Sequence, residues 1–136
     1  MSYEFLEHTA DTGIEVHAES VAQLFCDAAL GMFDLTYALV GGATSRTVDV
    51  EASGAGYEEL LVNWLAELLF QSEVADLAFC GFEVSHIDDT RVRATASAVP
   101  VAGLELDGPP IKAVTYHDLV VEQHPAGWRA TVIFDV

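Results

Sequence analysis

The sequence predicts an α+β protein, a two-layer sandwich in which two helices pack on one side of a mostly antiparallel or mixed β-sheet. Two segments repeat apolar residues at helical spacing, and seven shorter segments have the composition or the alternation of strands. Their order is strand, strand, helix, strand, helix and then four strands. The 136 residues, half of them hydrophobic, suffice for one compact domain over residues 1–136.

The first helix is predicted to begin after Ser20, following strands at residues 3–8 and 14–18. Ser20 and Gln23 have the S-x-x-Q spacing of a capping box. The next residues place one apolar face at helical spacing: Val21, Leu24, Phe25, Ala28 and Met32. The pair Gly41-Gly42 is expected to end the segment.

The second helix follows a strand at residues 47–52 and a turn at residues 54–56. Glu58 and Glu59 fall in its first turn, where acidic side chains complement the helix dipole. A wide apolar stripe comprises Leu60, Leu61, Trp64, Leu65, Leu68 and Leu69. Such a stripe could bind a partner, but packing against the sheet explains it without one, so we expect it to be core.

Two hairpins are predicted after the second helix, joined by a polar connection at residues 101–110. Their strands are residues 82–87 with 91–99, and residues 111–123 with 128–136. Alternation along the last strand places Trp128, Val132 and Phe134 on one face. Asp135 is therefore expected to point to the opposite face.

The charge of the chain is strongly acidic. Twenty-two Asp and Glu residues against five Lys and Arg give a formal net charge of −17. Such a surface repels a phosphate backbone, so direct nucleic-acid binding is not expected. It attracts cations and basic protein surfaces instead. Adaptation to high salt is an alternative explanation for the acidity.

Composition also bears on location. No apolar run approaches the ~20 residues of a membrane span, and the N-terminal residues do not resemble a signal peptide. Cys26 and Cys80 lack the spacing of a metal site, and we interpret them as free thiols in a reducing compartment. The sequence therefore predicts a cytoplasmic protein without a membrane anchor.

A candidate site is suggested by the polar stretch from His8 to Ile14 and by the end of the chain. Asp11 stands two residues before Gly13, which permits a sharp turn. Asp135 precedes Val136, which we expect to contribute a terminal carboxylate. Three such oxygen donors suit a hard divalent cation. The alternative is that Asp11 only makes a local turn hydrogen bond.

Motifs of common enzyme classes are absent. The chain has no Walker loop, GxGxxG, GxSxG or HExxH sequence, so we predict that it is not an enzyme. A small metal-dependent hydrolase using His8 and Asp11 is a weaker alternative, because no base that could activate water is evident. Lys112, the only lysine, lies in an apolar stretch. It either improves solubility or contacts an acidic group or a partner.

Five stretches together resemble the archease family. They are His8-Thr9-Ala10-Asp11 with Gly13-Ile14, the helix containing Leu24-Phe25 and Met32-Phe33, the stripe from Leu60 to Phe70, the motif Ile111-Lys112-Ala113-Val114-Thr115-Tyr116-His117, and the final Val132-Ile133-Phe134-Asp135-Val136. The resemblance runs nearly end to end. One departure is the loop at residues 98–103, which is more hydrophobic than the Gly-Glu loop usual in the family, so no function is carried onto it.

The resemblance implies a protein cofactor of the RtcB-type tRNA-splicing RNA ligase. That ligase joins RNA ends with GTP and manganese, and the cofactor is expected to promote guanylylation of the ligase's histidine and multiple turnover. The family's divalent cation would be held by Asp11, Asp135 and Val136. Calcium, magnesium and manganese all fit these donors. Direct roles for His8, Lys112 and His117 stay open, and a chaperone-like modulator of several clients is the alternative function.

Overall fold

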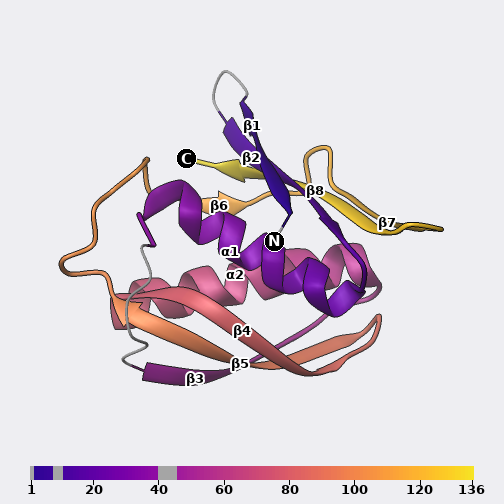
Figure 1. Ribbon diagram of the computed structural model, residues 1–136, viewed down its shortest axis with the longest axis horizontal. Coiled ribbons are helices and arrows are strands. Elements are labelled where there is room, and N and C mark those ends of the chain that lie inside the picture. The colour runs from indigo at the N-terminus through magenta and orange to yellow at the C-terminus, as the bar shows by residue number, and fades with distance from the viewer. Residues whose placement is uncertain (1, 8–10, 40–45) are drawn as a thin grey trace.

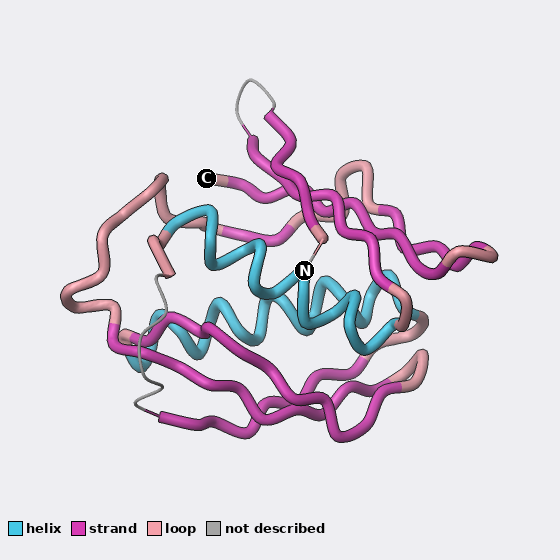
Figure 2. The backbone as a smooth tube through the Cα atoms, in the orientation of Figure 1, coloured by secondary structure: helices cyan, strands magenta, loops and turns pink. Residues whose placement is uncertain are grey.

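The computed structural model describes residues 2–7, 11–39 and 46–136. Its elements follow the order β1 (Tyr3–Glu7), β2 (Asp11–Ala18), α1 (Val21–Thr36), β3 (Arg46–Ser53), α2 (Tyr57–Ala75), β4 (Leu77–Ile87), β5 (Arg91–Pro100), β6 (Ala113–Val114), β7 (Val120–His124) and β8 (Gly127–Asp135). The two helices form the middle layer of the molecule, with strands above and below them (Figures 1 and 2).

The strands form two separate sheets. One has the order β1-β2-β8-β6, with β7 also paired to β8, and the other has the order β3-β5-β4. Every described strand pair is antiparallel. The α+β class and the packing of two helices on antiparallel strands are thus confirmed. The expected single sheet with both helices on one side is wrong, because α1 packs on β2 and on β4, which belong to different sheets.

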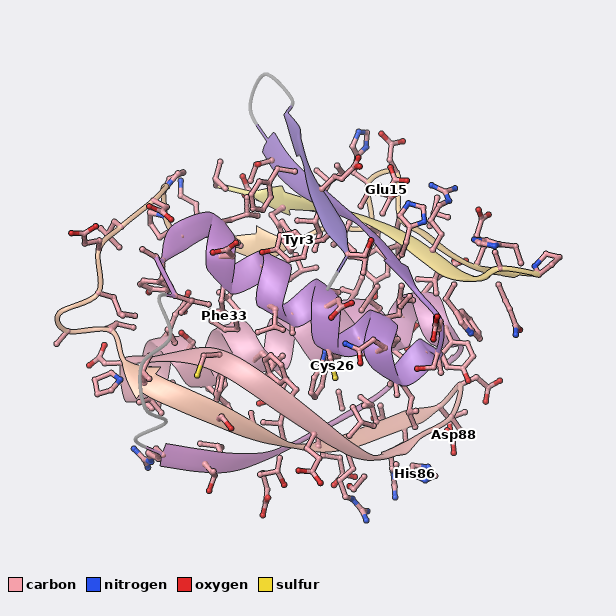
Figure 3. The ribbon with its side chains drawn as sticks, viewed as in Figure 1. Tyr3, Glu15, Cys26, Phe33, His86 and Asp88 are labelled. Carbon is pink, nitrogen blue, oxygen red and sulfur yellow. The ribbon has the colours of Figure 1, made fainter. Side chains whose placement is uncertain are left out.

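The burial of α1 explains this difference. Ten of its sixteen residues are buried, which is more than one apolar face requires. Cys26 and Phe33 lie on the side that faces the three-stranded sheet, whereas Tyr3 of β1 lies over the other side (Figure 3). The Phe33 ring packs edge-on against Phe79 of β4, with centroids 5.5 Å apart. The two buried sides of α1 are therefore covered by different sheets.

The predicted cap of α1 is confirmed in part. The Ser20 hydroxyl oxygen accepts a hydrogen bond from the Gln23 backbone N–H at 3.1 Å. The Gln23 side chain does not complete the capping box but donates to Asp27 at 2.7 Å. The helix ends at Thr36, before the expected stop at Gly41-Gly42, which lies outside the described residues.

The apolar stripe of α2 forms the centre of the core, as predicted. Trp64 is fully buried, and its indole N–H donates to the Phe25 carbonyl oxygen of α1 at 3.1 Å. Its ring also packs edge-on against Phe82 of β4, with centroids 5.7 Å apart. This side chain therefore joins both helices to the three-stranded sheet. No helix in the described part of the chain is long and apolar enough to cross a membrane.

The C-terminal strands differ in detail from the prediction. The first hairpin is confirmed, with β4 and β5 longer than expected. The single strand expected at residues 111–123 is instead two short strands, β6 and β7, both paired to β8. A turn separates them: the Leu119 N–H donates to the Tyr116 carbonyl oxygen at 3.2 Å, and Asp118 has a left-handed backbone with φ 50°.

Candidate metal and partner-binding site

The three motifs singled out in the sequence converge at the end of β8. Asp135 is paired with Asp11 of β2 on one side and with Ala113 of β6 on the other. The Lys112 N–H donates to the Asp135 carbonyl oxygen at 2.8 Å. Backbone pairing therefore places Asp11, Asp135 and Lys112, which are far apart in sequence, at one end of the five-stranded sheet.

Gly13 allows β2 to lie close to β8 next to this end. A Cβ atom at position 13 would lie 2.6 Å from the Val132 carbonyl oxygen and 2.7 Å from a methyl carbon of Ile133. No side chain fits at those distances without a shift of the backbone. Gly13 lies within β2, so the sharp turn expected at this position is wrong. The glycine of the first motif is needed instead for the close approach between the two strands.

Asp135 presents an exposed carboxylate at the end of β8. No described residue forms an ion pair with it. Val136 is partly buried and packs against the core. The orientation predicted for Asp135, away from the buried Val132 and Phe134, is consistent with this exposure.

Of the other candidate residues, the structure describes some and not others. His8 lies outside the described residues, and the same holds for the side chain of Asp11. Lys112 is exposed and has no ion pair with any described residue. His117 is exposed after β6, with its Nε2 atom 3.2 Å from the Asp118 carboxylate. No described contact joins His117 to Asp135.

The donors at this end fit a divalent cation in their chemistry. Carboxylate oxygens are the ligands that calcium and magnesium prefer, and they also suit manganese. Among the described residues, no group of three His, Cys, Asp or Glu side chains could hold a metal ion. The predicted ligand set includes the side chain of Asp11, which is not among the described residues. The metal site at Asp11, Asp135 and Val136 therefore stays a prediction.

A buried carboxylate on α1 was not singled out from the sequence. Asp27 is only 2% exposed and accepts hydrogen bonds from the Ser2 N–H at 3.4 Å and from the Gln23 side chain. Nearby, the Tyr3 hydroxyl donates to the Asp34 carboxylate, and burial together with this contact raises the Tyr3 pKa. These contacts fasten β1 to α1. The signal in the sequence was an acid four residues after Gln23 in the first predicted helix.

Comparison with known proteins identifies the family. The model of the Archease protein family (MTH1598/TM1083) matches residues 3–136. Protein archease of Methanosarcina mazei is 38% identical over 144 residues, covering 98% of this chain and 95% of the relative. Protein archease of Methanopyrus kandleri is 34% identical over 143 residues and covers all of both chains.

Solved structures show the same fold. The solution structure of Methanobacterium thermoautotrophicum protein 1598 superposes with a TM-score of 0.72 at 29% identity, covering 98% of both chains. A crystal structure of an archease from Thermotoga maritima, described as a possible chaperone, superposes with a TM-score of 0.66 at 18% identity, covering 96% of this chain and 94% of that one. The family match and the full-length relatives together show that the chain belongs to the archease family.

Proposed function

We propose that this chain is an accessory protein of the RtcB-type RNA ligase in tRNA splicing or RNA repair. In this role it promotes guanylylation of the ligase's histidine and allows multiple turnover. It is not itself a catalyst. Membership of the archease family carries this proposal, and the backbone pairing that brings the three motifs to one end of the five-stranded sheet supports it.

The electrostatics of the chain suit this role. A net charge of −17 favours docking on a basic protein over binding to RNA. The exposed Asp135 carboxylate and the Lys112 ammonium form no ion pair with a described residue. No such ion pair therefore has to be broken before a partner binds either group. Docking at this end costs little rearrangement of described ion pairs.

Asp11, Asp135 and Val136 would hold a divalent cation at the same end. The carboxylates would supply oxygen ligands, and the cation would supply positive charge at this end of the sheet. Asp135 would then present a fixed oxygen to it, because the main chain of Asp135 is bonded on both sides, to β2 and to the segment before β6. To activate the ligase, the chain must bind its reactive state more tightly than its resting state.

Multiple-turnover RNA ligation tests the proposal. The cognate ligase, GTP and manganese are mixed with RNA ends, and this protein is added at catalytic amounts as wild type, Asp135→Asn or Asp89→Asn. The matched control Asp89 is also exposed but lies between β4 and β5, in the other sheet. We expect wild type and Asp89→Asn to raise the number of turnovers and Asp135→Asn to fail. Absence of stimulation by the wild type would refute the accessory role, and equal stimulation by all three would refute the role of Asp135.

A chaperone-like modulator is the second candidate, since the related Thermotoga maritima archease is described as a possible chaperone. The described surface exposes several large hydrophobic side chains: Phe5, Phe70, Val74, Leu106 and Tyr116. A chaperone would suppress aggregation of unrelated unfolding proteins near equimolar amounts. Light scattering from such a client, with and without this protein, measures that activity. Suppression without any effect on the ligase would favour this second function.

A further inference from the structure

A cavity lies between the C-terminal ends of the two helices. Its volume is about 220 Å³. Val101 and Pro110, at the two ends of the segment that follows β5, form part of its wall. Its base is apolar and comprises Met32, Phe33, Leu69 and Ile111. In Figure 1 the ends of both helices, this segment and the C-terminus lie on the same side of the molecule.

The polar groups at the cavity differ in whether they already have a hydrogen-bond partner. Thr36 and Ser72 are buried, and their hydroxyl protons are already donated to the carbonyl oxygens of Pro109 and Leu77. Glu73 and Asp76, by contrast, carry exposed carboxylates that form no ion pair or side-chain hydrogen bond with a described residue. The available polar groups of the cavity are therefore mainly negative.

Two helix ends add to this negative potential. The C-cap residues, Tyr37 of α1 and Asp76 of α2, both line the cavity, and neither helix has a basic residue in its last turn. The C-terminal end of a helix carries partial negative charge and favours a nearby cation. The Tyr37 pKa is raised by burial and by the charges of Glu73 and Asp76, so their field reaches the cavity. No described cationic side chain lines it.

We propose that this cavity binds the alkylguanidinium or alkylammonium group of a basic side chain, an arginine or a lysine, presented by a partner protein. The aliphatic stem would pack on Met32, Leu69 and Ile111, as the stems of such residues pack on apolar surface. The charged head would lie between the carboxylates of Glu73 and Asp76. A volume of 220 Å³ is below the ~300 Å³ of ordinary small-molecule pockets, which suits one side chain better than a nucleotide.

The location links the cavity to the proposed function, on which the identity of the partner rests. Ile111 lines the cavity. The backbone N–H of the next residue, Lys112, donates a hydrogen bond to the carbonyl oxygen of Asp135. One basic surface of a ligase could therefore cover the end of β8 and place a side chain in the cavity.

A small-molecule probe tests the cavity without a ligase. Amide shifts are followed by two-dimensional NMR during titration with n-butylguanidinium, and with n-butylurea as the neutral isostere. We expect saturable shifts at Tyr37, Glu73, Asp76 and Ile111 with the cation only, at millimolar affinity. In the double variant Glu73→Gln/Asp76→Asn the affinity should fall at least ~5-fold, since both anionic partners are lost. Equal shifts with n-butylurea, or shifts elsewhere, would overturn the proposal.

The double variant Glu58→Gln/Glu83→Gln is the matched control, because it changes net charge equally through two exposed acids outside the cavity. It should bind the probe as the wild type does. In the ligation assay, the cavity variant should need at least ~5-fold more protein for half-maximal stimulation, whereas the control should not. If the cavity variant and the control need the same amount of protein for half-maximal stimulation, this inference is overturned and the accessory role stands. Failure of the wild type to stimulate, with probe binding retained, would refute the accessory role and the ligase as the partner, but not the cation chemistry of the cavity.

Discussion

Polar groups are satisfied differently in the helix layer and at the end of β8. In the helix layer, buried side chains such as Trp64, Thr36 and Ser72 donate to main-chain carbonyl oxygens, and no buried polar side-chain atom of the described residues lacks a partner. At the end of β8, Asp135 and Lys112 are exposed, and no described residue forms an ion pair with either. Substitutions in the first region should therefore change stability, and substitutions in the second should change binding.

Trp64→Ala should have the largest effect on stability. The variant removes a fully buried ring and leaves the Phe25 carbonyl oxygen without its donor. We expect the free energy of unfolding to fall by about 3–5 kcal/mol. Urea unfolding followed by circular dichroism measures this loss. A fall below about 1 kcal/mol would show that the helix layer does not depend on this contact, contrary to the comparison.

Gly13→Ala should have an intermediate effect that links the two regions. The added Cβ would approach the Val132 carbonyl oxygen, and a shift of β2 away from β8 should lower the free energy of unfolding by about 1–3 kcal/mol. Gly81→Ala in β4 is the control, since its Cβ would meet only Ser97 at ordinary contact distance, 3.6 Å. Equal unfolding midpoints for both variants would contradict the close approach of β2 to β8.

The elements that could be predicted from the sequence were those with strong periodicity. The Leu60 to Leu69 stripe lies in the core up to Leu68 and packs against it at Leu69, because an apolar face of that width has few alternatives to burial. Ser20 was identified as the N-cap because its hydroxyl acts locally, on Gln23. The first of the C-terminal hairpins was likewise evident from two alternating runs around Asp88-Asp89-Thr90.

What could not be predicted depends on contacts between distant segments. Alternation shows that a segment is a strand but not which sheet it joins, so the division into two sheets was missed. The turn that splits β6 from β7 depends on the left-handed backbone of Asp118. The cavity at Tyr37, Glu73 and Asp76 is formed where two helices end close together, and no motif in either helix signals it. The pairing of Asp11 with Asp135 is likewise a matter of register.

Alkaline pH should weaken the helix layer through Cys26. Burial, followed by the charge of Asp27, raises the Cys26 pKa from 9.0 to about 11. Between these values the unfolded chain loses the thiol proton and the folded chain keeps it, so the free energy of unfolding falls as pH rises from 9 to 11. Cys26→Ala should show a shallower fall over this range than the wild type in urea titrations. Identical slopes would show that Cys26 titrates normally in the folded protein.

Asp135→Asn should have the smallest effect on stability and therefore tests the second half of the comparison. In a chelator, its free energy of unfolding should lie within about 0.5 kcal/mol of the wild type, because the carboxylate is exposed and has no described ion pair to lose. Added calcium, magnesium or manganese should raise the midpoint of thermal unfolding of the wild type, since a ligand that binds only the folded state stabilises it. The variant should show a much smaller rise. A large loss of stability in the chelator would mean that Asp135 supports the fold directly, and the distinction between the two regions would then fail at its most exposed residue.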